Sequence, residues 1–330
     1  GLPLVQRNQR HMTLNMKDPR GRALFEKLLA DADIVLEGFR PGVTTRLGID
    51  YAACAKINPR VVYCSISGYG QDGPYRDKVG HDLNYLGYSG ILGVTGPAGG
   101  APQIMPVQVA DIGGGALMGV VGILAALAAR EHTGRGQFVD ISMMDGSVIW
   151  NAFHQIMLLA TGKDPERGRT QLTGHNPCYA VYETKDGKHV TVGALEPHFW
   201  ANLCNHLGVP ELIADQFAEG ARREEMFAIL REKFLQKTRD EWVAELEPID
   251  ICFGPVNSVS ESLADPQIVA RGLVHKVGGL TLVGSPIRLS DTPAAAPTAP
   301  PAFGQHTDET LRGLGLDQGA IDALRADGVI

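Results

Sequence analysis

The sequence is poor in the residues that build covalent or metal-held frameworks. Its 330 residues include five cysteines, which are scattered and form no C-x-x-C pair. Because five is an odd number and the spacing is irregular, we interpret the thiols as free and the compartment as reducing. The ten histidines form no H-x-x-x-H or H-E-x-x-H pattern, so the sequence predicts no metal site.

The sequence also lacks an excess of positive charge and a long apolar run. Its 37 acidic residues outnumber its 30 lysines and arginines, so the net charge is -7. A nucleic-acid partner is not expected, because no surplus cations remain to neutralise phosphates. We recognise no signal peptide, and the longest apolar stretch, residues 115–129, is too short for a bilayer. We interpret this stretch as a buried helix and expect a protein of the bacterial cytoplasm without a membrane span.

What is present suits a two-domain α/β protein. Hydrophobic residues make up 44% of the chain, enough for a large core, and the length suggests two domains. In the first part, strand patterns at residues 33–36, 61–66 and 138–141 alternate with helix patterns at 18–33, 51–57 and 114–130. This alternation predicts buried parallel strands in a Rossmann-like, doubly wound large domain.

The pattern changes after a further helix at residues 142–159. Two strand patterns, 179–184 and 189–193, flank an Asp-Gly turn, and helices are predicted at 198–207, 222–236 and 239–246. We therefore predict a smaller α+β domain over residues 179–280, joined by a linker helix over 146–178 to a large domain over 1–145. Residues 281–330 return to the large domain through a strand at 284–289, a Pro/Ala linker at 293–301 and a helix from Asp308.

A glycine-rich loop follows the second predicted strand. Residues 68–73 fit G-x-G-x-x-G, but Pro74 follows where a dinucleotide-binding motif needs a helix. We interpret these residues as a loop at the carboxyl end of a strand, which is where α/β sheets place their ligands.

Two polar residues near this loop are candidates for proton transfer. His81 follows Gly80 in a predicted loop, where a neutral imidazole suits a general base, although a surface histidine fits equally. Asp111 opens the apolar helix, either as its N-cap or as a catalytic carboxyl. Three glycines follow Asp111 and cost helix stability, so we expect something to approach the backbone closely there. The free N–H groups of Gly113 and Gly114 are candidate donors to an oxyanion.

Further charged residues suit a binding role. Glu196 precedes Pro197 and either caps a helix, is simply exposed, or orients a histidine. Four basic residues in or beside predicted loops suit a pyrophosphate, or are single solvated charges: Lys17, Arg40, Arg46 and Arg76.

Taken in order along the chain, several motifs resemble those of the family III CoA-transferases of the CaiB/BaiF type. They lie at residues 14–21 (Leu-Asn-Met-Lys-Asp-Pro-Arg-Gly), 37–43, 65–75, 80–85 (Gly-His-Asp-Leu-Asn-Tyr), at the Asp111 helix start, and at 134–137 and 304–309. Transferases of this family commonly carry tyrosine at the position of His81. The histidine, 30 residues before Asp111, resembles the α-methylacyl-CoA racemases within the family.

The resemblance implies racemisation of 2-methylacyl-CoA thioesters by proton transfer through an enolate. It implies His81 and Asp111 as the acid/base pair, Glu196 as the carboxylate beside the histidine, and an interlocked homodimer with shared active sites. It implies no cofactor, because coenzyme A is part of the acyl-CoA substrate. The residues that it implies for CoA or substrate binding are Leu14, Asn15, Met16, Lys17, Gly38, Phe39, Arg40, Arg46, Gly80, Asp82, Leu83, Asn84 and Tyr85.

Two other functions remain open from the sequence. Family transferases use the aspartate matching Asp111 as a nucleophile that forms an acyl anhydride. Family members also carry a further strand–helix unit before the region that matches residue 1. Its absence implies an open sheet edge and weaker CoA affinity, so the third hypothesis is a CoA-binding protein that is inactive through N-terminal truncation.

Overall fold

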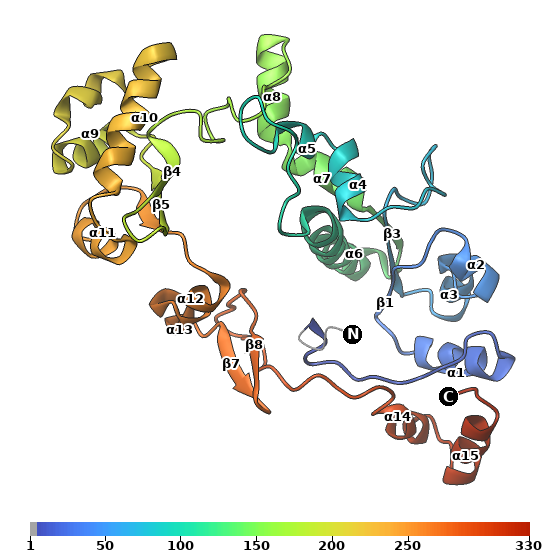
Figure 1. The fold of residues 1–330 in the computed structure, drawn as a ribbon. Helices are drawn as coiled ribbons and strands as arrows, with labels where there is room; N and C mark the ends of the chain where they lie inside the picture. The colour runs from blue at the N-terminus through green and yellow to red at the C-terminus, as the bar shows by residue number, and fades with distance from the viewer. Residues whose placement is uncertain (1–4) are drawn as a thin grey trace. The chain divides into compact units, whose positions relative to one another are not determined.

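The computed structural model describes residues 5–330, and their contacts separate two compact units (Figure 1). The first unit comprises Gly1–Tyr85, Val109–Gly146 and Val259–Ile330, and the second comprises Leu86–Gln108 and Ser147–Ser258. Two segments group differently from the predicted division. Residues 86–108 belong with the second unit, and residues 259–280 belong with the first.

A three-stranded parallel sheet forms the centre of the first unit, as the alternating pattern predicts. Strand β2 (Val62–Ser67) lies between β1 (Ile34–Glu37) and β3 (Phe138–Ser142). Five of the six β2 residues are buried, which explains why the strand contains no charged residue. Helices α1 (Pro19–Leu29) and α3 (Tyr51–Ile57) contribute Leu29 and Cys54 to a core with Tyr63.

The C-terminal part of the first unit differs from the prediction. The predicted strand at 284–289 is wrong: a hairpin of β7 (Val274–Val277) and β8 (Leu280–Val283) precedes it instead. Pro286 has no N–H to donate, which disfavours a ladder at that position. The final helix is two helices, α14 (Thr307–Gly313) and α15 (Gln318–Ala326), which pack on the N-terminal segment through Leu24. Shorter helices are α2 (Val43–Leu47), α4 (Asp82–Tyr88), α12 (Val259–Ala264) and α13 (Pro266–Ala270).

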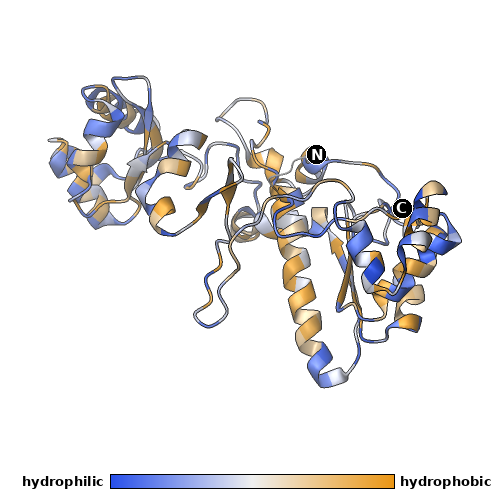
Figure 2. Cartoon of the chain, turned by 90° about the horizontal axis from the view of Figure 1, so that it is seen from below, coloured by the Kyte–Doolittle hydropathy of each residue, from blue (hydrophilic) through white to orange (hydrophobic). Residues whose placement is uncertain are grey.

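The apolar helix is longer and more exposed than the sequence predicts. It begins as a π-helix (η2, Val109–Leu117) and continues as α6 (Met118–Thr133) up to Gly134. The whole Val109–Thr133 helix has 25 residues and is long and apolar enough, by length and composition, to cross a membrane. That corrects the expectation that the run is too short. The expected burial is also only partial, because Leu124 on its outer side is 59% exposed. Figure 2 shows this helix as apolar along most of its length.

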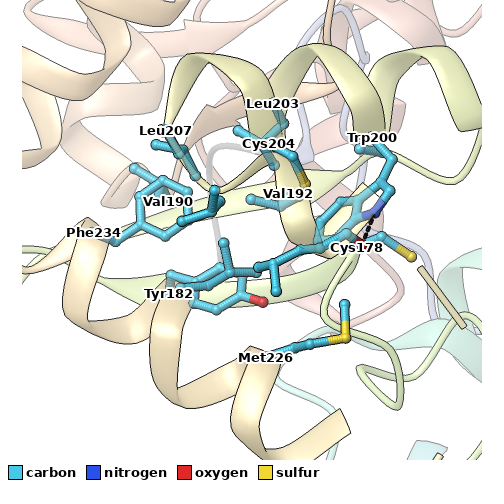
Figure 3. Packing of buried hydrophobic residues seen from close by; sticks show 14 of the residues in the cluster. Cys178, Tyr182, Val190, Val192, Trp200, Leu203, Cys204, Leu207, Met226 and Phe234 are labelled. Atoms are coloured by element: carbon cyan, nitrogen blue, oxygen red, sulfur yellow. Dashed lines mark hydrogen bonds between the residues drawn. The ribbon is translucent and has the colours of Figure 1, made fainter. Parts of the chain in front are cut away.

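The second unit contains an antiparallel sheet with a closed core. Strands β4 (Tyr179–Glu183) and β5 (His189–Gly193) form the predicted hairpin, and β6 (Phe253–Pro255) pairs with β5. Helices α9 (Pro197–His206), α10 (Gly220–Phe234) and α11 (Arg239–Leu246) supply the other side of the core (Figure 3). Trp200 is fully buried there, and its indole Nε1–H donates to the Leu212 carbonyl at 3.1 Å.

The predicted helix at 142–159 is interrupted at Asn151. It divides into α7 (Met143–Trp150) and α8 (Ala152–Thr161). The Asn151 side chain donates to the Ser89 carbonyl and contacts the His154 ring at 3.0 Å. Such side-chain bonds compete with helix continuation, which explains the break. The second unit also contains α5 (Ile91–Val94) and the 3₁₀-helix η3 (Pro210–Asp215).

Candidate active site

A cavity of about 660 Å³ lies at the carboxyl ends of the strands of the first unit. This is the edge where parallel sheets place ligands, because loops there follow directly from the buried strands. The residues that line it are Gly38, Phe39, Arg40, Pro41, Ile66, Ser67, Gly68, Tyr69, Arg76, Lys78, Val79, Gly80, His81, Asn84, Tyr85, Asp111 and Met143. His81 and Asp111, predicted as a pair, therefore face the same cavity.

His81 lies in the loop that immediately precedes α4, as predicted, although the sequence analysis did not predict α4 itself. The Asn84 N–H donates to the His81 carbonyl at 2.8 Å, and the His81 N–H donates to the Asn84 side-chain oxygen at 3.0 Å. These two bonds form a reciprocal cap at the first turn of the helix. They fix the His81 backbone, while its exposed imidazole stays available to the cavity.

Tyr85 explains two glycines of the motifs. Its ring is buried, its hydroxyl donates to the Gly80 carbonyl at 2.6 Å, and it packs edge-to-face on Tyr69. A Cβ at Gly68 would lie 2.4 Å from the Tyr85 hydroxyl oxygen, and one at Gly80 would lie 2.8 Å from its ring. Both positions therefore need glycine for the tyrosine to fit.

Asp82 connects the two candidate catalytic residues. Its carboxylate oxygen Oδ1 accepts the Ala110 N–H at 2.7 Å and the Asp111 N–H at 3.0 Å. Asp82 thus caps the π-helix from a distant part of the sequence, and Asp111 is not the cap. Because Asp82 follows His81 in the chain, this contact sets the spacing between the two candidate catalytic residues.

The same contact changes the acidity of Asp111. Partial burial of the carboxyl raises the pKa of Asp111, and the nearby negative charge of Asp82 raises it further. The positive form of His81 lowers the pKa of Asp111, so the imidazole is near enough to interact electrostatically with the carboxyl. The net shift is upward, which favours the protonated acid.

The glycines after Asp111 allow backbones to approach closely. A Cβ at Gly146 in α7 would lie 2.5 Å from the Gly114 Cα, so the two helices touch through glycine. A Cβ at Gly119 would lie 2.9 Å from Ile66 on β2. The expected close approach is thus made by the protein itself. The predicted oxyanion donors are not at the cavity wall: Gly114 is buried, and neither it nor Gly113 lines the cavity.

A cationic rim borders the cavity. Arg40, Arg76 and Lys78 line it, and the Arg76 guanidinium donates to the Gln71 carbonyl at 2.9 Å. Arg46 lies beside this rim, since a Cβ at Gly42 would be 3.6 Å from both the Arg46 and the Arg76 guanidinium groups. These cations can hold a phosphate-bearing group at the mouth of the cavity.

Other predicted binding residues lie outside the cavity lining. Residues 14–17 run along the C-terminal segment, where the Asn15 N–H donates to the Val329 carbonyl at 2.8 Å. Leu14 belongs to the core formed with α14 and α15, and Leu83 is exposed on α4. Lys78 lines the cavity although no motif included it, and Tyr69 lines it although it was not named as a candidate within the 65–75 motif. Their position in the loop after β2 is the signal that identifies them.

Glu196 lies in the second unit and is described by itself. It occupies the N-cap position of α9, but its side chain makes no capping hydrogen bond there. Its residue is exposed, so its carboxylate is free of the capping role that the sequence allowed. Within residues 5–330, no group of three or more His, Cys, Asp or Glu side chains is arranged to hold a metal ion.

The chain is similar to known proteins over nearly its whole length. The chain matches the CoA-transferase family III over residues 2–307. An acyl-CoA transferase of Fusarium pseudograminearum is 36% identical over 99% of this chain and 74% of its own. The α-methylacyl-CoA racemase of Mus musculus is 34% identical over 100% of this chain and 87% of its own. The crystal structure of a CAIB/BAIF family protein from Brucella suis superposes with a TM-score of 0.84 at 33% identity, covering 94% of this chain and 83% of that one.

Proposed function

This chain belongs to CoA-transferase family III, and we propose that it racemises 2-methylacyl-CoA thioesters. The observation that carries the proposal is the shared cavity of His81 and Asp111, with Asp82 bonded to the backbone of Asp111. A histidine and a carboxyl that line one cavity can serve as the base and the acid of a proton exchange between opposite faces of a carbon.

The proposed reaction moves one proton off the α-carbon and another onto it. Neutral His81 takes the proton from one face, and the electrons of the broken C–H bond form the enolate of the thioester. Protonated Asp111 then gives its proton to the opposite face. The turnover leaves His81 protonated and Asp111 ionised, which is the state that converts the opposite enantiomer. The substrate supplies its own CoA, and the reaction needs no other cofactor.

A second candidate is CoA transfer, which the name of the Fusarium pseudograminearum relative favours. In that reaction the ionised Asp111 attacks the thioester carbonyl, forms an acyl anhydride and releases the CoA thiolate. We rank this reaction second because transferases of the family commonly carry tyrosine where this chain has His81, whereas the racemases carry histidine. His81 has no required role in it.

Isotope exchange distinguishes the two reactions. The full chain is incubated in D₂O with one enantiomer of a 2-methylacyl-CoA, and α-deuteration and chirality are followed. Racemisation predicts that both change together, and that His81→Ala and Asp111→Asn each lower the rate by about 10²- to 10⁴-fold. The matched controls, His132→Ala and Asp291→Asn, keep the rate.

Contrary results have defined meanings. Acyl exchange to an added carboxylic acid, with full rate in His81→Ala and an anhydride trapped by hydroxylamine, supports transfer instead. Binding of the thioester with neither exchange nor transfer rejects both reactions.

We extend the proposal to a homodimer in which Glu196 accompanies His81 of the partner subunit. The exposed apolar side chains of α6, α7 and α8 support a second copy of the chain as their cover, among them Leu124, Ile149 and Leu159. Light scattering of the purified chain tests the dimer. Mixing inactive His81→Ala and Glu196→Gln subunits tests the shared site: a heterodimer with shared sites regains one intact site, whereas sites within single chains regain none.

A further inference from the structure

A second, smaller cavity lies in the first unit, beside the β7–β8 hairpin. It has a volume of about 330 Å³ and is bounded by the end of α13, the hairpin and the segment over residues 285–297. None of its lining residues belongs to the cavity lined by His81 and Asp111, which we call the acyl-CoA cavity. Its volume lies at the lower end of the range of small-molecule sites, so it suits a compact ligand.

Two arginines and a histidine give this cavity its charge. Arg271, Arg288 and His275 line it, and its lining contains no aspartate or glutamate. Within residues 5–330, neither Arg271 nor Arg288 forms an ion pair. The Arg288 guanidinium donates to the Arg271 carbonyl, which holds the two residues together. Two guanidinium groups without a counter-charge are a receptor for an oxyanion, which they bind through parallel charge-assisted hydrogen bonds.

The backbone around these side chains leaves room for them. A Cβ at Gly284 would lie 2.6 Å from the His275 Nε2, so only glycine lets the imidazole lie against the backbone there. Gly272 has a φ of +65°, which glycine adopts without strain, and a Cβ there would lie 3.8 Å from the Arg288 guanidinium. Gly284 therefore lets His275 border the cavity, and Gly272 allows the turn of the backbone beside Arg288.

The rest of the cavity wall is largely apolar. Ile287 and Leu289 are 63% and 55% exposed, and the extended Pro/Ala segment over residues 293–297 completes the wall. A bare inorganic ion would leave this wall uncovered. A ligand with one anionic group and a short hydrocarbon body covers it and satisfies the arginines together.

We propose that this cavity binds a small organic anion. Its carboxylate or phosphate group is held by Arg271 and Arg288, with His275 as a further donor, and its hydrocarbon part lies on Ile287 and Leu289. The site is separate from the acyl-CoA cavity and does not depend on which reaction occurs there.

Calorimetric titration of the full chain tests the proposal with hexanoate and hexyl phosphate as probes. Saturable binding of either probe at one site is expected, and the stronger of the two identifies the anionic group. Arg271→Gln and Arg288→Gln each weaken that binding by about tenfold or more, since each removes charge-assisted hydrogen bonds. Arg312→Gln, an exposed arginine elsewhere in the same unit, leaves the affinity unchanged.

Other measurements separate this site from the acyl-CoA cavity and from misfolding. Excess CoA does not displace the probe, and Arg76→Gln leaves probe binding intact. Leu289→Glu keeps both arginines and puts a negative charge on the apolar wall, so it also weakens binding. The proposal is overturned if neither probe saturates or if CoA competes with the probe. It is also overturned if Leu289→Glu and Arg288→Gln bind the probe with normal affinity while their thermal unfolding curves show that both variants are folded.

Discussion

The two units use apolar residues in opposite ways. In the second unit, the core around Trp200 is closed, and the indole is wholly removed from water. In the first unit, the apolar α6 packs one side on the sheet through glycines and leaves residues such as Val121 and Leu124 more than half exposed. Apolar residues thus form a closed core in one unit and an uncovered surface in the other.

The strongest test of this contrast is Trp200→Ala. Removing the indole leaves a cavity in a closed core and an unpaired Leu212 carbonyl, so the free energy of unfolding of the second unit falls by about 3–5 kcal/mol. Denaturant titration with a probe in this unit measures it. A loss below about 1 kcal/mol would mean that the core is looser than described.

A second test adds one methyl group where two helices meet. Gly146→Ala places its Cβ 2.5 Å from the Gly114 Cα, and backbone cannot yield as a side chain can. We expect a loss of about 1–3 kcal/mol in the first unit, together with lower activity as the Asp111 helix moves. Gly313→Ala, in α14 with nothing near its added Cβ, is the matched control. Equal stability of the two variants contradicts the close approach.

A third test concerns the uncovered side of α6. Val121→Gln changes the free energy of unfolding of the isolated chain by no more than about 0.5 kcal/mol, because more than half of the Val121 side chain is already exposed to water. Chemical denaturation at low protein concentration measures it. If a second copy covers this side, the same variant weakens association in light scattering. A large, concentration-independent loss would mean that α6 is covered within the chain.

The smallest expected effect comes from Asp82→Asn. The amide oxygen can still accept the Ala110 and Asp111 N–H groups, but the negative charge is gone, so the pKa of Asp111 falls. A carboxyl whose folded pKa is raised stabilises the fold at low pH and loses that contribution as pH rises through the folded pKa. The variant therefore loses less stability as pH rises than the native chain. In a plot of the isotope-exchange rate against pH, the acid limb of the variant moves to lower pH. An unchanged acid limb contradicts the effect of the Asp82 charge on the pKa of Asp111.

Elements with local signals are predictable from the sequence. Helices over residues 51–57 and 239–246 have the predicted bounds, because their apolar spacing and caps lie within the segments themselves. Helix α4 was not predicted, because the glycine and polar residues at 80–84 resemble a turn. The break at Asn151 depends on Ser89, which is far away in the chain.

The candidate site, like the fold, was predictable only in part from the sequence. Family motifs put His81 and Asp111 forward, and both line one cavity. The role of Asp82 was missed, because it depends on a hydrogen bond to a residue 28 positions further along the chain. The place of residues 14–17 was also missed, since their contacts are with the other end of the sequence.

The bond between Asp82 and the Asp111 backbone has a consequence for how such a site changes over evolution. It anchors the backbone of Asp111, and with it the Asp111 carboxyl, to the scaffold. His81, the residue before Asp82, contributes its backbone to the cap of α4, and within residues 5–330 its side chain forms no hydrogen bond. A single substitution at position 81 can therefore exchange the partner of the carboxyl while the scaffold stays intact. One scaffold would in this way serve both the proposed proton transfer and the alternative acyl transfer.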